Sequence, residues 1–491
     1  MSMRLGWSRR SFLSALGVVS GGLFAPHEMK AEGIFGHHNH EGAPSVDGNP
    51  IVPITSGLGS TNIYEELGVT PLVNINGTLT VIGGSIIPVE AMELYRQGNA
   101  HCCSINDLEV AAGKWMAKLC KWPDGYTGLV TCGAAAGIVV AYAGMMTEDL
   151  TPRIRQCPDV TGFPKTEVII QKTHRYPFDH QIRQTGAKLV EVETKEEMIN
   201  AINPKTLAIH FLHINADRGK VSGQEILEIA KAHGVYTFND MAADVPPIER
   251  LWITPQEGWD FVAFSGGKDI KGPQATGLLI GKEQLIHYAL LNMSPNEDTI
   301  GRPCKVGKEA IFAFLKALEL FVGQDYNKTI ADYDNDAATI SKALDKFGVT
   351  SLPREFKPDG LGNVTPRYSW RIDPSKVKLT GREVTEQLAA TTPVAIGAMS
   401  HGAGGEAGHW PADNTDQSVQ EGNLEWNPQT QSITPAPMAW LNGEEHMEGR
   451  GRFGRDRDPN VFGFSMWQLK DGEANYIANR LVEIFSQAQK A

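Results

Sequence analysis

Residues 261–277 read FVAFSGGKDIKGPQATG, an apolar run followed by a glycine-rich turn that contains a lysine. The run is typical of a strand buried on both faces, so the turn would lie at the carboxyl end of that strand. A lysine shielded from water has a lowered pKa and keeps the free amine that forms a Schiff base with a carbonyl compound. We therefore predict that Lys268 holds a carbonyl compound and that Ser265 donates to a phosphate. Lys271 is the rival lysine, one turn further from the strand.

Other short β-rich runs alternate with helix-like stretches in the same part of the chain. They are TGLVT (127–131), EVIIQ (167–171), KLVEVE (188–193), LAIHFLH (207–213), VYTFND (235–240) and GLLIG (277–281). One intervening stretch, GQEILEIAKAHG (223–234), is amphipathic and ends in the glycine expected just past a helix. This alternation predicts an α/β domain with a mostly parallel sheet, in which ligands bind at the carboxyl ends of the strands.

Two more of these strand ends carry unusual residues. After TGLVT the chain continues with Gly133, Ala134 and Ala135, and small residues here let backbone N–H groups at a helix N-terminus approach an anion. A turn made small for strand–helix packing would look the same. Asp240 ends VYTFND, where a buried acid either caps a helix or meets a cation such as a pyridinium nitrogen. An anion cradle, an acid and a lysine at successive strand ends describe a pyridoxal 5′-phosphate site.

Several longer segments extend this pattern over more than four hundred residues. They are LGVTPLVNINGTLTVIGG (67–84), TCGAAAGIVVAYAG (131–144), HQIRQTGAKLVEVET (180–194), FNDMAADVPP (238–247), SGGKDIKGPQATGLLIG (265–281), GRPCKVGKEAI (301–311) and LKDGEANYIANRL (469–481). On these segments the chain resembles fold type I pyridoxal-phosphate enzymes, in the branch of bacterial selenocysteine synthase (L-seryl-tRNA selenium transferase) and D-glucosaminate-6-phosphate ammonia-lyase. The S-G-x-K motif followed by G-P-Q is the most specific of the matches.

The resemblance implies an aspartate-aminotransferase-like large domain with a seven-stranded, mostly parallel sheet, and a smaller α+β C-terminal domain. It implies that Lys268 bonds the cofactor and that Asp240 partners its ring nitrogen. The phosphate would lie against the turn of residues 133–135 and Ser265. Further candidates, near the substrate or a dimer neighbour, are Asn74, Asn76, Thr78, Arg302 and Lys305; for each of them a structural hydrogen bond is the alternative.

The N-terminus reads WSRRSFLSALGVVSGGLFA (7–25), with Arg9 and Arg10 before an apolar run. The run is too short for a permanent membrane anchor but suits the apolar region of a signal peptide. It resembles the twin-arginine export signal, which predicts cleavage near Ala31 and a periplasmic or exported protein that meets the twin-arginine machinery. The alternative is a basic tail that is never translocated.

The remaining organisation follows from composition. Residues 32–60 are rich in Gly, Pro, Ser and His and predict a flexible linker. We expect a large domain over 61–310, a C-terminal domain over 311–491, and a long loop at about 399–435. The basic run 449–458 alternates with acids, which favours a solvated loop. Outside candidates for binding a carboxylate there are Arg450, Arg452 and Arg455.

Composition also excludes some classes of function. A formal net charge of −12 argues against a nucleic-acid surface, which needs a clustered basic face. The cluster His101, Cys102 and Cys103 lacks a second ligand pair at metal spacing, so we expect buried cysteines there and no metal site. No stretch after the N-terminal region is apolar and long enough for a membrane helix.

These features together predict a pyridoxal-phosphate-dependent lyase, of the elimination or ammonia-lyase type, acting on an amino acid or amino-sugar acid. Two alternatives stay open: a transferase related to the selenium transferase, and a catalytically silent periplasmic protein that binds the cofactor. The resemblance also implies a homodimer or a larger homo-oligomer and a small-molecule amine substrate.

Overall fold

The computed structural model describes residues 62–358, 364–391, 394–397, 422–427, 432–437 and 458–489. The predicted signal peptide, the linker, most of the 399–435 loop, and Arg450, Arg452 and Arg455 lie outside these ranges. The chain divides after Val69. The described part of the first unit holds α2 (Ile63–Glu66), whose N-cap Asn62 accepts from Tyr64 N at 3.1 Å. The unit Thr70–Ala491 is described below.

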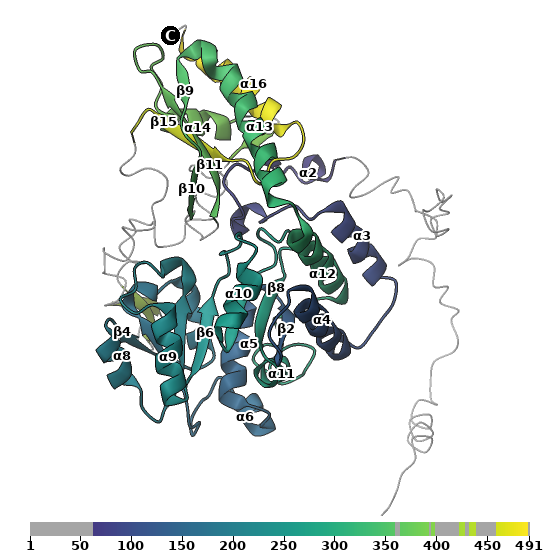
Figure 1. Cartoon of the computed structure of the whole chain (residues 1–491), viewed down its shortest axis with the longest axis vertical. Helices are drawn as coiled ribbons and strands as arrows, with labels where there is room; N and C mark the ends of the chain where they lie inside the picture. Colours follow the sequence, from purple (N-terminus) through teal and green to yellow (C-terminus); the bar gives the residue numbers. More distant parts are fainter. Residues whose placement is uncertain are drawn as a thin grey trace, which may run out of the picture. The chain divides into compact units, whose positions relative to one another are not determined.

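A seven-stranded sheet forms the centre of the larger of two sheet-containing parts of this unit (Figure 1). Its order is β2 (Tyr126–Thr131), β8 (Gly277–Lys282), β7 (Phe261–Ser265), β6 (Tyr236–Asp240), β5 (Thr206–Leu212), β3 (Glu167–Gln171) and β4 (Lys188–Val192). Neighbouring pairs from β7 to β4 are parallel, and β8 runs antiparallel to both β2 and β7. The carboxyl ends of β2, β7, β6, β5 and β3 therefore share one edge. All seven predicted runs form strands of this sheet, so the predicted α/β architecture is confirmed.

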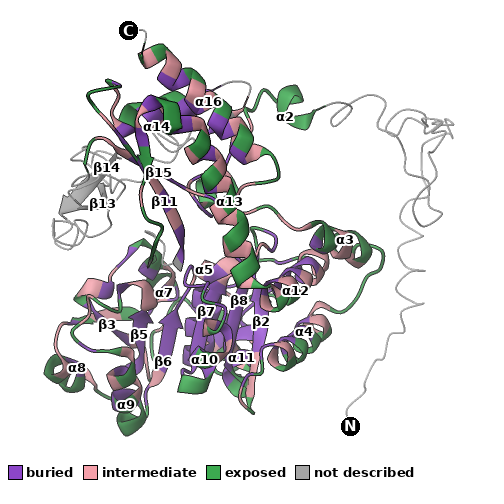
Figure 2. Ribbon diagram, turned by 45° about the horizontal axis from the view of Figure 1, so that its top comes forward, coloured by how far each residue is buried: buried purple, intermediate pink, exposed green. Residues whose placement is uncertain are grey.

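Helices cover both faces of the sheet, which explains why inner strands such as β5 and β7 are buried along nearly their whole length, whereas the edge strand β4 is partly exposed. One core includes side chains of α3 (Val89–Gly98), α4 (Ile105–Leu119), α8 (Lys195–Ala201), α9 (Gly223–His233), α10 (Arg250–Glu257) and α12 (Lys308–Gly323). The other includes side chains of α5 (Gly133–Thr147), α7 (His180–Gln184) and α11 (Glu283–Leu291). Figure 2 shows the buried strands between their helices. The predicted stop of α9 is confirmed, since Gly234 is its C-cap at φ 63°.

A second core belongs to a smaller antiparallel sheet of β9 (Val349–Ser351), β10 (Glu355–Pro358), β11 (Val364–Ile372) and β15 (Val461–Ser465). The helices α13 (Tyr326–Leu344), α14 (Gly381–Ala389) and α16 (Glu473–Ala488) pack on it. Val73 and Ile75 join this core from the other end of the chain, and β1 (Leu72–Val73) pairs in parallel with β12 (Ala395–Ile396). The segment around β1 thus links the part built on the seven-stranded sheet to the part built on the smaller sheet. The domain boundary at 310/311 stays a prediction.

Two of the six cysteines differ from expectation. Cys102 and Cys103 are exposed, because they lie in the connection before Ser104, the N-cap of α4; Cys120 and Cys157 are buried. Their predicted burial was wrong. Among the described residues, no group of His, Cys, Asp or Glu side chains is arranged to hold a metal ion.

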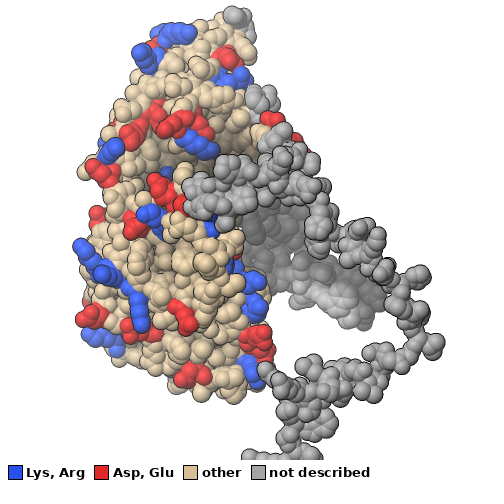
Figure 3. Space-filling view, turned by 90° about the vertical axis from the view of Figure 1, so that its right-hand side faces the viewer, with Lys and Arg blue, Asp and Glu red and all other residues tan. Residues whose placement is uncertain are grey.

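The described residues show neither a one-signed charged patch on the face in Figure 3 nor a membrane-spanning helix. On the face shown in Figure 3, Lys and Arg side chains lie interspersed with Asp and Glu, so that face has no extended patch of one sign. Within the part of the chain that the structure describes, no helix combines the length and apolarity needed to cross a bilayer.

Candidate active site

Lys268 lies in a tight turn at the carboxyl end of β7. Gly266 N donates to Thr276 O at 2.8 Å, Gly272 N donates to Gly266 O at 2.8 Å, and Lys271 N donates to Lys268 O at 2.9 Å. A methyl group at Gly267 would overlap the backbone of Gln274, so only glycine fits between the two arms of the turn. The glycine-rich sequence therefore serves to close this turn and to fix the lysine at the strand end.

Asp240 ends β6, the strand next to β7, and its side chain is only 3 % exposed. Its Oδ1 atom accepts from Ala242 N at 3.0 Å, and the nearest following helix, α10, begins only at Arg250. The helix-cap alternative is therefore wrong. Burial raises the pKa of Asp240, while the hydrogen bond from Tyr176 and the charge of Lys268 lower it. A buried carboxylate in this position gains from a further cation, as a protonated pyridine nitrogen supplies.

A hydrogen-bond chain runs from Asp240 into the core. Tyr176 OH donates to Asp240 Oδ2, and His210 Nε2 lies 3.2 Å from the same hydroxyl. Tyr142 OH lies 2.9 Å from His210 Nδ1. Burial lowers the pKa of His210 to about 3, so the ring is neutral and can donate only through one nitrogen. The chain is satisfied when Tyr142 donates to Nδ1, Nε2–H donates to Tyr176, and Tyr176 donates to the carboxylate.

The predicted phosphate cradle begins at Gly133, whose φ is 85° and whose missing side chain leaves open space. No side chain caps the N-terminus of α5. A methyl group at Gly277 would lie 2.6 Å from Ala134 N, and Gly277 pairs in register with Ser265. The structure thus brings Ser265 to the turn of Gly133, Ala134 and Ala135. Free backbone N–H groups at a helix N-terminus beside a serine suit a phosphate.

The GRPCK segment packs on the same helix. A methyl group at Gly301 would lie 2.7 Å from Val140 Cγ1 of α5. Burial raises the pKa of Cys304 on this segment, and the charge of Cys132, the residue that precedes Gly133, raises it further. Arg302 and Lys305 are exposed on this segment, and their role in cofactor or dimer contacts stays a prediction.

The three substrate-side candidates lie on one loop, but they differ in their bonds. Asn74 holds the loop itself, because its Nδ2 donates to Gly77 O at 2.9 Å and its Oδ1 accepts from Asn76 N and Gly77 N. Asn76 Nδ2 and Thr78 Oγ1 are buried and have no partner. A structural hydrogen bond thus accounts for the side chain of Asn74, but the side-chain atoms Asn76 Nδ2 and Thr78 Oγ1 make no such bond.

Sequence reasoning missed the polar residues that support the site from neighbouring strands. Tyr176 follows β3, and His210 lies within β5, where a histidine in the apolar run LAIHFLH was the available signal. His213 follows β5, and its Nδ1 lies 2.8 Å from Oδ1 of the buried Asp244. Asp244 thereby orients an imidazole at the same sheet edge as Asp240.

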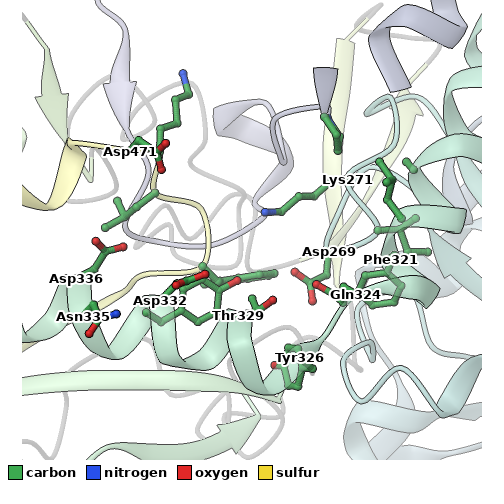
Figure 4. Close-up of a pocket in the computed structure, with 18 residues that line it drawn as sticks. Asp269, Lys271, Phe321, Gln324, Tyr326, Thr329, Asp332, Asn335, Asp336 and Asp471 are labelled. Carbon is green, nitrogen blue, oxygen red and sulfur yellow. The ribbon is translucent and has the colours of Figure 1, made fainter. Parts of the chain in front are cut away.

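A cavity of 610 Å³ lies beside the lysine turn, lined by Asp269 and Lys271 from that turn. Figure 4 shows further carboxylates around it, including Asp332 and Asp336 of α13. Burial, then the charges of Asp332 and Asp471, raise the pKa of Asp336. This acidic lining disfavours an anion, so the anionic groups of a cofactor or substrate fit the cradle at Gly133 better than this cavity.

Comparison with known proteins shows which families the chain is similar to. The family model Aminotransferase class-V matches residues 175–295. The D-glucosaminate-6-phosphate ammonia lyase of Salmonella typhimurium is 27 % identical over 338 residues, which cover 67 % of this chain and 86 % of that protein. The 5′-C-glycyluridine monooxygenase-decarboxylase of a Streptomyces species is 25 % identical, over 67 % of this chain and 82 % of that protein.

Selenium transferases match over shares of this chain that range from 21 % to 66 %. The L-seryl-tRNA(Sec) selenium transferase of Rhizobium meliloti is 31 % identical over 29 % of this chain and 34 % of that protein. A solved structure of D-glucosaminate-6-phosphate ammonia-lyase superposes with a TM-score of 0.64 at 22 % identity, over 87 % of this chain and 99 % of that one. The chain thus has the aspartate-aminotransferase fold, fold type I, and it is a pyridoxal-phosphate-dependent enzyme.

Proposed function

We propose that the chain is a carbon–nitrogen lyase that releases ammonia from an amino acid or amino-sugar acid. The observation that carries the proposal is that Lys268, fixed in the turn after β7, and the buried carboxylate of Asp240 lie at the ends of neighbouring strands. The similarity to the ammonia lyase, which extends over 86 % of that protein, supports the reaction type.

Each residue of the site has a task in this reaction. When bound, pyridoxal 5′-phosphate takes up the electron pair that the substrate α-carbon releases as it loses its proton. Lys268 Nζ would bond the cofactor at rest and, once free, would accept that proton. Ionised Asp240 holds the proton on the ring nitrogen, and the hydroxyl of Tyr176 stabilises the ionised form. The α5 N-terminus and Ser265 hold the phosphate.

The rest of the reaction follows from the substrate. The electron pair left by the α-proton would form a double bond to the β-carbon, whose leaving group would depart with the electron pair of its own bond. The enamine that is released would then react with water to give a keto acid and ammonia. A transferase would instead add a nucleophile at the same stage, which is the second candidate function. Two selenium transferases match over 71 % of their own length, and the ammonia lyase matches over 86 % of its length. Elimination is therefore the first candidate and transfer the second.

The test is ammonia and keto-acid release from a panel of amino acids and amino-sugar acids by the holoenzyme. We expect release by the wild type and none by Lys268→Ala, with Lys271→Ala as the matched control that retains activity. A silent cofactor-binding protein would take up the cofactor, show its visible absorption and release nothing from any amine. That outcome would contradict the lyase proposal.

We also propose a homodimer formed through the apolar surface around α3. Val81, Ile86, Val89, Met92 and Tyr95 are all large apolar side chains at least 36 % exposed, and Val89 is 82 % exposed. Isolated exposed apolar residues are ordinary, but a cluster on one helix and its approach is typical of an interface. Sedimentation of wild type and of Val89→Glu tests this: a dimer that dissociates in the variant is expected, and a monomeric wild type would contradict the proposal.

We further propose that the protein is exported through the twin-arginine route. The pair Arg9–Arg10 before an apolar run supports this proposal. Replacing both arginines by lysine is expected to keep the protein in the cytoplasm, as fractionation with a marker of each compartment would show. Equal export of the variant and the wild type would refute the twin-arginine route.

A further inference from the structure

Four buried polar side-chain atoms without a hydrogen-bond partner lie on two segments of the chain. They are Asn76 Nδ2, Thr78 Oγ1, Ser465 Oγ and Gln468 Nε2. Buried polar atoms in folded proteins are almost always bonded, so unpaired ones call for a specific explanation. Thr78 is 1 % exposed and Gln468 is 6 % exposed, and bulk water therefore does not satisfy them.

The two segments are adjacent although nearly four hundred residues separate them in the chain. Ser465 N donates to Ile75 O at 3.0 Å, directly before Asn76. A methyl group at Gly77 would lie 3.0 Å from the indole ring of Trp467, directly before Gln468. The four unpaired atoms thus belong to residues that flank two contacts between the same segments.

The same loop is attached to the turn that holds Lys268. Ser85 Oγ donates to Gly267 O at 3.0 Å, and Gln274 Nε2 donates to Thr80 O at 2.9 Å. The group of four donors is therefore connected, through a few residues on each side, to the reactive lysine. A substrate whose amine is at Lys268 can extend from there toward this group.

The chemistry of the four side chains selects the class of ligand. Two are amides that donate through N–H, and two are hydroxyls that both donate and accept. None is charged, whereas the cavity at Asp269 is acidic. Neutral donors and acceptors on two adjacent segments suit the hydroxyl groups of a sugar-like chain, and a short substrate such as serine would leave these buried atoms unpaired.

We propose that Asn76, Thr78, Ser465 and Gln468 form the subsite for the hydroxyl-bearing carbon chain of an amino-sugar acid. This inference rests on the proposed lyase function and narrows its substrate from amino acids in general to polyhydroxylated ones. Binding of that chain supplies the partners that the four atoms lack.

Thr78→Val is the sharpest test, because valine keeps the shape of threonine and removes only the hydroxyl. The ligand-free variant is expected to keep or raise the thermal midpoint of the wild type, since the lost hydroxyl makes no bond and its burial costs free energy. D-gluconate, which has no amine and cannot react, is expected to bind the holoenzyme about tenfold more weakly in Thr78→Val and in Gln468→Leu. The KM for D-glucosaminate should rise with it, while the KM for serine stays constant.

Thr185→Val is the matched control, because Thr185 is equally buried and its Oγ1 donates to Ile182 O at 2.7 Å. That control should lower the thermal midpoint and leave D-gluconate binding unchanged. If Thr78→Val lowers the midpoint and leaves binding unchanged, Thr78 is structural and the subsite is refuted.

The two proposals fail separately. Wild type that binds D-gluconate through Thr78 but releases ammonia from no amine would contradict the lyase proposal alone. Release of ammonia from serine without any binding of D-gluconate would contradict the subsite alone.

Discussion

Replacing Tyr176 by phenylalanine tests whether a buried hydrogen-bond chain sets the charge on Asp240. The hydroxyl of Tyr176 donates to Asp240 Oδ2 and lies 3.2 Å from His210 Nε2. A hydrogen bond to a charged group contributes about 1.5–3 kcal/mol, which corresponds to roughly one to two pKa units. The substitution removes a contribution that lowers the pKa of Asp240, so this pKa, already raised by burial, rises further.

The holoenzyme should register that change in its pH–rate profile. With a higher pKa, Asp240 is less often ionised and competes for the proton on the ring nitrogen. We therefore expect kcat for ammonia release to fall about tenfold to a hundredfold at neutral pH. The acidic limb, where Asp240 takes up a proton, should move to higher pH by about one to two units. Stability should also fall by about 1–3 kcal/mol, because His210 Nε2–H loses its acceptor.

Tyr142→Phe is the matched control for this experiment. Tyr142 lies one link further along, 2.9 Å from His210 Nδ1, and its loss leaves the bond between Tyr176 and Asp240 in place. We expect it to lower stability by a similar amount and to move the profile little. A Tyr176→Phe profile that superimposes on the wild type, with stability reduced, would show that Tyr176 only fills the core.

Three further changes give independent tests. Burial lowers the pKa of His210 to about 3 and of His174 to about 4, from 6.5, so as pH falls the unfolded chain binds these protons before the folded chain does. Each histidine should therefore reduce the free energy of unfolding by roughly 2 kcal/mol at about pH 5. Equal free energies of unfolding at pH 5 and pH 7, measured with denaturant, would contradict this. Burial raises the pKa of Glu109 from 4.5 to about 8, so the folded protein loses stability as pH rises and this side chain must ionise. Relative to the wild type, Glu109→Gln should therefore raise the free energy of unfolding by about 3 kcal/mol near pH 7 and leave it unchanged near pH 4. A gain that does not depend on pH would refute the raised pKa. Gly267→Ala should abolish cofactor uptake because the added methyl group overlaps Gln274, whereas Gly323→Ala, with open space around it and no positive φ, should retain uptake. Full uptake by the first variant would show that the turn can open.

The parts of the site that the sequence predicted are those fixed by local pattern. Apolar runs of strand length separated by helix-like stretches predicted the parallel sheet, and in such a sheet consecutive carboxyl ends meet at one edge. Asp240 and Lys268 follow strands that are neighbours in that sheet, so their proximity followed from topology alone. The turn at Gly133 followed in the same way.

The parts that could not be predicted depend on contacts between distant segments. Tyr176 lies 64 residues before Asp240, and no spacing rule indicates that its hydroxyl reaches that carboxylate. Ser465 lies beside Asn76 only because the N-terminal segment crosses into the smaller sheet, which no local pattern shows. Cysteine is a residue type that is usually buried, but Cys102 is exposed because it lies in the connection before α4. There the tertiary packing, and not the residue type, decides the exposure.

The most direct measurement is the position of the cofactor on the chain. Borohydride reduction of the holoenzyme, followed by digestion and mass spectrometry, traps pyridoxal phosphate on the lysine that holds it. We predict one modified peptide that contains the glycine-rich turn after β7, with the added mass on Lys268. An adduct on Lys271 or any other lysine, or no adduct in protein that has taken up cofactor, would contradict it.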